Sequence, residues 1–271
     1  MIDIHCHLLP GVDDGARHLD VSLEMARIAA AEGVTTIACT PHIQPGVFDN
    51  DAAGIREAVQ DLQEAIDEAG IAVTLVVGSD AHIRPDFVSA IRAGEIATLN
   101  DTKFVLFEPP HHIAPQRMDD LLFDILAAGY VPIVTHPERL TWISSHYELF
   151  VRLSRSGVWM QITAGSLTGS FGRGPKMWAE RMLIDGVVHV IATDAHGAKR
   201  RPPLMRDAIR DAERLVGPHE TQNLVSIRPR AILLNSDEFT PPKAPCETSP
   251  PPKAKRGAFW PMPDILNRAA R

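Results

Sequence analysis

Residues 2–42, IDIHCHLLPGVDDGARHLDVSLEMARIAAAEGVTTIACTPH, contain a complete strand–helix–strand unit. The run IDIHCH predicts a strand, and LDVSLEMARIAAAE carries apolar residues at helical spacing before Gly33, a residue type that commonly ends helices. VTTIACT then predicts a second apolar strand. Because a strand, a helix and a strand in this order favour parallel pairing, the unit predicts an α/β protein.

The same alternation continues along most of the chain. Five further apolar runs predict strands, with helix-period segments between them: VTLVVG, KFVLFE, YVPIVTH, VWMQIT and VVHVIATD. In the segment AAGIREAVQDLQEAIDEAG, one helical stripe consists of Ile55, Val59, Leu62 and Ile66. Seven short apolar strands in a row indicate a seven-stranded (β/α) barrel, and an open doubly wound sheet is the alternative.

Most of the predicted strands end in residues of the types that commonly bind metal ions. These residues are His5, His7, His42, Asp80, His82, Glu108, His136, Asp194 and His196. Side chains alternate along a strand, so His5 and His7 lie on one face and Cys6 on the other. The carboxyl ends of parallel strands share one rim, where we expect these ligands to meet. Imidazoles and carboxylates without thiolates suit manganese, iron or zinc, in sufficient number for two or three ions.

Two arginines follow predicted ligands closely, Arg139 in THPER and Arg201 in TDAHGAKRR. A guanidinium close to metal cations is unfavourable unless an anion lies between them, and phosphate has the required charge and geometry. We therefore expect Arg139 and Arg201 to bind phosphate, with two solvent-facing loop arginines as the alternative. Arg200 is expected to face solvent.

Several catalytic motifs are absent from the chain. No cysteine has an arginine six positions further on, and no G-x-S-x-G, G-x-x-x-x-G-K-[ST] or G-x-G-x-x-G motif occurs. The sequence thus does not support a cysteine phosphatase, a serine hydrolase, a P-loop protein or a dinucleotide-binding protein. In QITAGSLTGSFGRG, the residues Gln161, Ser166 and Thr168 either line the substrate pocket or belong to a plain glycine-rich loop.

The composition excludes further classes of protein. With 45% hydrophobic and 23% charged residues the chain is globular, and its net charge of -7 argues against a protein that coats nucleic acid. The sequence has neither an apolar run of roughly 18 residues nor a basic leader before an apolar run, so we expect no membrane span and no secretory signal. Cys6, Cys39 and Cys246 do not form a disulfide framework, which favours the cytoplasm.

The strand–helix alternation stops near Asn235, and a segment rich in proline follows. We expect a folded domain over residues 1–235 and a disordered or surface-draped tail over residues 236–271. The last stretch, FWPMPDILNRAAR, carries Phe259 and Trp260, through which the tail would dock against the domain.

The motifs HCH, TPH, FE, THPER and TDAH, in this order, resemble those of the PHP (polymerase and histidinol phosphatase) superfamily of metal-dependent phosphoesterases. DIHCHLLPGVDDG, ACTPHI, QITAGSLTGSFG and TDAH followed by RPP resemble, more narrowly, the bacterial manganese-dependent tyrosine-protein phosphatases of capsule and exopolysaccharide systems. The resemblance covers about residues 1–235. It implies a distorted seven-stranded TIM-like barrel, a trinuclear metal site and dephosphorylation of the tyrosine-rich tail of a bacterial tyrosine autokinase.

Carried over by position, the resemblance implies eight metal ligands and two phosphate-binding arginines. The ligands are His5, His7, His42, Asp80, Glu108, His136, Asp194 and His196, and the arginines are Arg139 and Arg201. Asp80 stands where the best-known relatives have the longer glutamate. His82 is outside this set and is expected to support the ligands or the fold.

Three other functions are compatible with these motifs. A histidinol-phosphate phosphatase or another small-molecule phosphoesterase of the superfamily would use the same metal site, and a nucleotide phosphodiesterase is a further possibility. A pseudoenzyme that binds metal and docks on the export kinase through the proline-rich tail is the alternative without catalysis. The intact pair Arg139 and Arg201 beside a full ligand set favours an enzyme.

Overall fold

The computed structural model describes residues 1–244 and contains all seven predicted strands, two of which are each broken into two segments. VTTIACTPHI forms β2 (Thr36–Cys39) and β3 (His42–Ile43), and TLVVGSDAH forms β4 (Thr74–Val77) and β5 (Asp80–His82). The unbroken strands are β1 (Ile2–Cys6), β6 (Phe104–Glu108), β7 (Val131–Thr135), β8 (Trp159–Thr163) and β9 (Val190–Ala192). Every strand pairing among the described residues is parallel, as predicted.

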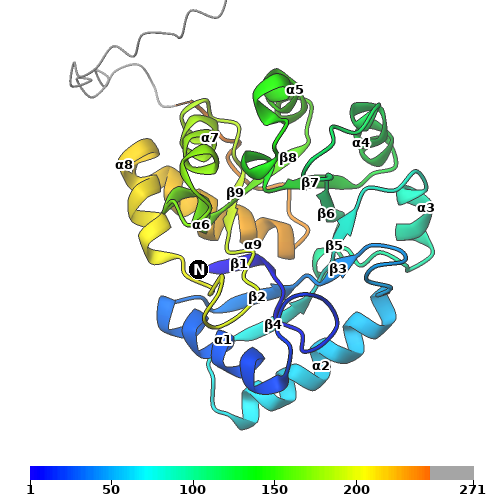
Figure 1. The fold of residues 1–271 in the computed structure, drawn as a ribbon, viewed down its shortest axis with the longest axis vertical. Coiled ribbons are helices and arrows are strands. Elements are labelled where there is room, and N and C mark those ends of the chain that lie inside the picture. The colour runs from blue at the N-terminus through cyan, green and yellow to red at the C-terminus, as the bar shows by residue number, and fades with distance from the viewer. Residues whose placement is uncertain (245–271) are drawn as a thin grey trace, which may run out of the picture.

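The strands follow one another around a barrel-like arrangement (Figure 1). One sheet has the order β1-β2-β4 and the other the order β3-β5-β6-β7-β8-β9, with short connections from β2 to β3 and from β4 to β5. After β9 the chain returns to β1, where the Asp194 N–H donates to the His5 carbonyl at 2.8 Å. The His7 N–H likewise donates to the Ala195 carbonyl at 2.9 Å. This neighbourhood of the first and last strands agrees with the predicted distorted TIM-like barrel.

Both strand breaks lie at residues that interrupt a regular ladder. Pro41 has no N–H to donate, although its carbonyl accepts from the Asp80 N–H at 3.0 Å. Gly78 packs so tightly that an added Cβ would lie 2.8 Å from Leu99 Cδ2. Beyond these breaks β3 and β5 resume pairing with His42 opposite Asp80, so the breaks lie directly before two of the predicted ligands.

Helices surround the strands (Figure 1). They are α1 (Leu19–Glu32), α2 (Ala52–Glu68), α3 (Phe87–Arg92), α4 (Met118–Ala127), α5 (Ile143–Arg155), α6 (Ala164–Leu167), α7 (Arg173–Ile184), α8 (Arg206–Gln222) and α9 (Arg228–Leu233). Gly33, at a φ of 90°, ends α1 as predicted, and the predicted stripe of α2 is buried. The sequence pattern does not predict α8, because the buried face of this helix includes the small residues Ala208 and Ala212.

Helix α9 covers the amino ends of the strands. Its Ile232 and Leu233 belong to an apolar cluster with Phe104 and Trp159, which are the first residues of β6 and β8. The side chains of this cluster exclude water from that end of the barrel. The carboxyl ends of the strands are therefore the end that remains open to polar side chains.

Among residues 1–244 none of the helices combines the length and the apolar character needed to cross a bilayer. Residues 236–244 contain neither helix nor strand. The predicted domain boundary at residue 235 stays a prediction, and the rest of the predicted tail, with Cys246, Phe259 and Trp260, lies outside the described residues.

His189 is a buried histidine that should make stability depend on pH. Its ring stacks on Trp159 with a centroid distance of 4.8 Å, and its Nδ1 accepts from the Met160 N–H at 3.1 Å. Burial, assisted by the nearby Arg228 guanidinium, lowers the pKa of His189 to about 3. Below the ordinary histidine pKa of about 6.5 the unfolded chain binds a proton that the folded chain does not, so acid favours unfolding.

We expect His189 to remove about 1.4 kcal/mol of stability per pH unit as the pH falls from about 6 to about 4. In H189N, the amide oxygen replaces Nδ1 as acceptor and nothing titrates, so this part of the slope should disappear. Urea denaturation of both chains at several pH values, under the same metal conditions, measures the difference. Equal slopes for the two chains would contradict the assignment.

Candidate metal centre

The eight side chains that the resemblance implies as ligands all lie at the carboxyl ends of the strands. They come from β1 and the residue after it (His5, His7), β3 (His42), β5 (Asp80), the end of β6 (Glu108), the residue after β7 (His136) and the segment after β9 (Asp194, His196). The structure therefore brings together residues spread over almost the whole described chain. Their roles as metal ligands stay a prediction, whereas the expected convergence at one rim is observed.

The first group of ligand atoms surrounds His5. Its Nε2 lies 3.2 Å from His7 Nε2, 3.3 Å from Asp80 Oδ2 and 3.5 Å from Asp194 Oδ1. His7 Nε2 in turn lies 3.4 Å from Asp194 Oδ1. All four side chains are buried. His5 and His7 thus point into one spot, as their spacing predicts.

The second group of ligand atoms surrounds Glu108. His42 Nδ1 lies 3.3 Å from Glu108 Oε2 and 3.5 Å from Asp80 Oδ2, and His136 Nε2 lies 3.7 Å from Glu108 Oε1. Asp80 consequently belongs to both groups, between His5 and His42. The shorter acid at this position still reaches histidines of both groups.

The residues present fit divalent cations. Both carboxylate oxygens of Asp80 are buried and have no hydrogen-bond partner among the described residues. A buried carboxylate without a partner is costly, and a cation between its neighbours would compensate its charge. The surrounding donors are imidazole and carboxylate groups, which suit manganese, iron and zinc.

The site also shows strong electrostatic coupling. Burial lowers the pKa of His5, but Asp80 and Asp194 outweigh burial and raise this pKa to about 9. The pKa of His42 is likewise raised to about 10, because Glu108 and Asp80 outweigh its burial. In the absence of cations, protons on these imidazoles therefore balance the carboxylates. Metal binding must displace such protons, which makes affinity rise with pH.

His136 has the opposite character. Burial and the nearby Arg139 guanidinium lower its pKa well below the ordinary value, against the attraction of Asp194 and Glu108. The ring is therefore neutral at physiological pH. A neutral imidazole is the form that binds a metal ion.

Two residues outside the predicted ligand set orient His5 and His7. Asp13 Oδ2 lies 2.6 Å from His7 Nδ1, and Gln161 Oε1 lies 2.8 Å from His5 Nδ1. Each contact occupies the second ring nitrogen, so Nε2 is the nitrogen that faces the site. The sequence signal that could have identified Asp13 is the pair of acidic residues, Asp13 and Asp14, shortly after the first strand.

Of the two alternatives for the glycine-rich segment, the structure does not support a pocket lined by Gln161 and Ser166. Gln161 is fully buried against His5, and Ser166 is fully buried and donates to Glu138 Oε1 at 2.7 Å. Of this glycine-rich segment, Thr168 lies on an open cavity of about 450 Å³ that Phe171 also lines. Gln161 and Ser166 are therefore inaccessible to a substrate. They support the site through their hydrogen bonds to His5 and Glu138.

Three further polar residues lie at the edge of the cluster. Asp14 Oδ1 is 3.4 Å from His196 Nε2 and 3.5 Å from His42 Nε2. Its carboxylate therefore lies close enough to these imidazoles to be a further candidate metal ligand. His82 Nδ1 is 3.4 Å from Glu108 Oε2, and His111 Nε2 is 3.9 Å from Glu108 Oε1. The location of His82 beside a predicted ligand is compatible with its expected supporting role. Sequence reasoning missed Asp14 and His111 as neighbours of the site.

Arg139 and Arg201 extend into the same mouth, a cavity of about 310 Å³. Both guanidiniums donate to Asp194 Oδ2, and Arg201 also donates to the Asp194 backbone carbonyl at 2.9 Å. The Phe171 ring lies 4.3 Å from Arg139 Cζ and 5.6 Å from Arg201 Cζ, at cation–π range. Arg200 is exposed, as predicted.

Three site residues have a left-handed backbone. The φ angles are 37° at His136, 50° at Asp194 and 55° at Arg201. This region is uncommon for residues other than glycine and is often found at functional sites. In His136 and Asp194 the unusual backbone falls just after a strand ends, so the chain turns there while the side chain enters the mouth.

Comparison with known proteins agrees with this arrangement. A family model described as capsular polysaccharide synthesis, CpsB/CapC, matches residues 1–234. The tyrosine-protein phosphatase YwqE of Bacillus subtilis is 35% identical over 90% of this chain and 96% of its own length. The tyrosine-protein phosphatase CpsB of Streptococcus pneumoniae is 28% identical over 87% of this chain and 99% of its own.

A solved structure from a study of YwqE and CpsB, described there as unique metal-dependent tyrosine phosphatases, is also similar. It has a TM-score of 0.86 and 35% identity, and covers 90% of this chain and 99% of its own. A probable 2-pyrone-4,6-dicarboxylic acid hydrolase from Acinetobacter baumannii matches with a TM-score of 0.51 and 14% identity. At that identity the likeness concerns the fold alone.

Proposed function

Because the chain belongs to the CpsB/CapC family of capsular polysaccharide synthesis, we propose that it is a metal-dependent tyrosine-protein phosphatase. Its substrate is phosphotyrosine on a bacterial tyrosine autokinase, and its activity regulates capsule or exopolysaccharide production. The observation that supports this most directly is the convergence of the eight imidazole and carboxylate side chains proposed as ligands with Arg139 and Arg201 at the carboxyl ends of the strands. Such a mouth has the charges needed for a phosphate monoester.

The proposed cofactor is Mn²⁺, as two or three ions, with iron or zinc as alternatives. The eight proposed ligands are His5, His7, His42, Asp80, Glu108, His136, Asp194 and His196. When bound, divalent cations lower the pKa of water and withdraw charge from phosphoryl oxygens. Asp13 and Gln161 hold the imidazoles of β1 in the tautomer that presents Nε2.

Arg139 and Arg201 are proposed to hold the phosphoryl group. Both guanidiniums already contact one anion, the Asp194 carboxylate, and the Phe171 ring restricts their orientation. An arriving phosphate would offer further oxygens to these guanidiniums, which can bind such oxygens through two parallel hydrogen bonds. They also stabilise the charge that develops on these oxygens. Tyrosine, with a pKa of about 10, departs more readily than an alkyl alcohol.

In this proposal the protein acts in the cytoplasm and recognises the phosphorylated tail of the kinase. Cys6 and Cys39 support this location, because they face each other in the β1–β2 pairing and remain free thiols. A reducing compartment keeps such a buried pair in this state. The proposal involves neither nucleic acid nor direct insertion into a membrane.

One experiment separates this function from its alternatives. The purified protein should hydrolyse a phosphotyrosine peptide, lose activity in excess chelator and regain it with added Mn²⁺. Histidinol phosphate and a nucleotide diester should react much more slowly than the phosphotyrosine peptide. Elemental analysis of the same preparation counts the bound ions. Full activity in chelator, or a preference for histidinol phosphate, would overturn the proposal, and complete inactivity with bound metal would indicate a pseudoenzyme.

A further inference from the structure

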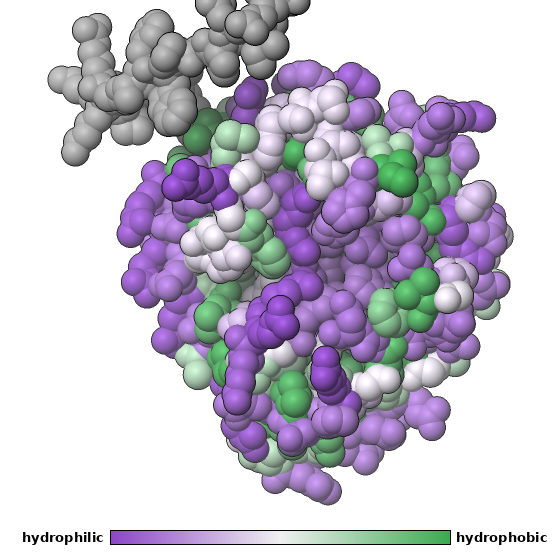
Figure 2. All heavy atoms as spheres, in the orientation of Figure 1, coloured by the Kyte–Doolittle hydropathy of each residue, from purple (hydrophilic) through white to green (hydrophobic). Residues whose placement is uncertain are grey.

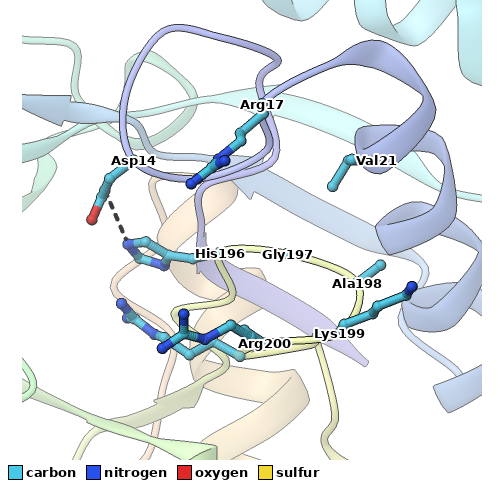
Figure 3. A pocket seen from close by; sticks show the side chains of 10 residues that line it. Asp14, Arg17, Val21, His196, Gly197, Ala198, Lys199 and Arg200 are labelled. Carbon is cyan, nitrogen blue, oxygen red and sulfur yellow. Dashed lines mark ion pairs between the residues drawn. The ribbon is translucent and has the colours of Figure 1, made fainter.

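A second cavity, of about 780 Å³, adjoins the catalytic mouth. Asp14, His196 and Arg201 line both cavities, so the two are direct neighbours. Figure 3 shows the second cavity between the loop that carries Arg17 and the loop that follows β9. A polypeptide whose phosphate occupies the mouth must continue across the neighbouring surface. The second cavity is therefore placed to contact residues that flank the phosphotyrosine.

The wall of this cavity carries positive charges without partners. Arg17, Lys199 and Arg200 line it, and none of the three forms an ion pair within residues 1–244. Other arginines of this chain, such as Arg56 and Arg84, pair with nearby acids, whereas these three cations gather around one cavity. Figure 2 shows that hydrophilic residues dominate the middle of this view of the molecule. The cavity wall is thus a concentrated source of unneutralised cations.

The acid that lines the cavity does not neutralise these cations. Asp14 points toward His196 (Figure 3), and its Oδ1 lies 3.4 Å from His196 Nε2 and 3.5 Å from His42 Nε2. Its charge is therefore directed to the catalytic cluster rather than to the basic wall.

Backbone contacts hold both basic loops in place. Gly15 lies so close to β1 that an added Cβ would be 2.3 Å from the His7 carbonyl oxygen, and the Ala16 N–H donates to that oxygen at 3.1 Å. The loop after β9 is closed by the His196 N–H, which donates to the Arg201 carbonyl at 3.0 Å. The cations thus extend from anchored loops, which reduces the entropy lost when they bind an anion.

We propose that this cavity is an anion subsite that binds acidic groups flanking the phosphotyrosine and so directs the enzyme to acidic peptide segments. The inference rests on the proposed function, because it assumes that a phosphotyrosine peptide occupies the mouth. Guanidinium and ammonium groups attract carboxylates and phosphates and raise the rate of encounter with anionic partners. Carboxylate side chains and a second phosphate group share this chemistry, and the experiment separates them.

The experiment compares kcat/KM of the metal-loaded enzyme on four substrates. These are p-nitrophenyl phosphate, a phosphotyrosine peptide flanked by alanines, the same peptide flanked by glutamates, and a peptide with a second phosphotyrosine. We expect the glutamate peptide to exceed the alanine peptide about tenfold at low salt, and the advantage to shrink at high salt. An advantage confined to the doubly phosphorylated peptide would identify phosphate as the preferred anion.

The triple variant R17A/K199A/R200A should abolish this preference while its rate on p-nitrophenyl phosphate stays within about threefold of wild type. The matched control is R92A/R152A/R155A, which removes the same charge from exposed positions on α3 and α5 without breaking an ion pair of the described chain. This control should keep the preference. Equal rates of the wild-type enzyme on alanine and acidic peptides would overturn the subsite while leaving the phosphatase function intact. Failure to hydrolyse any aryl phosphate would instead refute the proposed function.

Discussion

Replacement of Asp194 by asparagine should lower kcat for aryl phosphate hydrolysis by about 10³-fold or more. The Asp194 carboxylate lies within 3.6 Å of the ring nitrogens of His5, His7 and His196, and it accepts from both guanidiniums of the mouth. Asparagine has nearly the same shape but no charge. The variant thus removes a proposed metal ligand and the anion that balances two arginines in one step.

The ionisation of Asp194 explains why the effect should be so large. Burial opposes the charged form, but the nearby His5, His7, Arg201 and Arg139 outweigh it and hold the pKa of Asp194 well below its ordinary value. The carboxylate is therefore charged at every pH at which the enzyme is expected to work. An amide leaves the surrounding cations without their counterion, which is costly in a buried site.

Steady-state kinetics and elemental analysis measure this prediction together. We expect D194N to lose bound metal as well as turnover. The matched control is D101N, which removes an exposed carboxylate that pairs with Arg56, and it should behave like wild type. If D194N retained more than about a tenth of the activity, its proposed role as a ligand would be refuted.

Replacement of Arg139 by alanine should lower kcat/KM about 10²–10³-fold, while the metal content stays unchanged. Among the described residues, the Arg139 guanidinium hydrogen-bonds to the Asp194 carboxylate and lies over the Phe171 ring. We therefore expect Arg139 to bind the phosphoryl group and not to affect the binding of metal ions. R139K should recover only part of the loss, because an ammonium group keeps the charge but not the planar bidentate geometry.

The control for this change is R155A, an exposed arginine near the end of α5. It should leave turnover and metal content unchanged. An R139A enzyme with normal kcat/KM would show that Arg139 does not bind the phosphoryl group. A loss of metal in R139A would instead assign it to the support of the ligands.

The parts of the protein that could be predicted from the sequence are those in which regular apolar patterns mark the strands and residues of metal-binding type follow at the strand ends. The strands carry continuous apolar runs, and His5, Glu108 and His136 follow directly from the rule that parallel strands present their carboxyl ends at one rim. The helix stripe of α2 was equally clear because its apolar side chains are large. Helix α8 was not recognised, since the alanines on its buried face give little contrast.

The supporting residues were harder to identify from the sequence. Gln161 and Ser166 occur in a segment rich in glycine and hydroxyl residues, a composition that suggests a loop, yet both are buried. Their roles depend on contacts with His5 and Glu138, which are distant in the chain. Pattern alone does not reveal such pairings, because each partner is an ordinary polar residue. Asp13 is the exception, since it lies only six positions after His7, the histidine whose ring it contacts.

The left-handed backbone at His136 and Asp194 restricts which amino acids these positions tolerate. Aspartate, asparagine and histidine adopt that conformation more readily than most residues, and aspartate and histidine also bind metals. One choice of amino acid therefore satisfies both the local chain geometry and the coordination chemistry. An alanine scan would remove a proposed ligand and strain the turn at once, whereas asparagine at these two positions changes the side-chain chemistry but keeps a residue that tolerates this backbone.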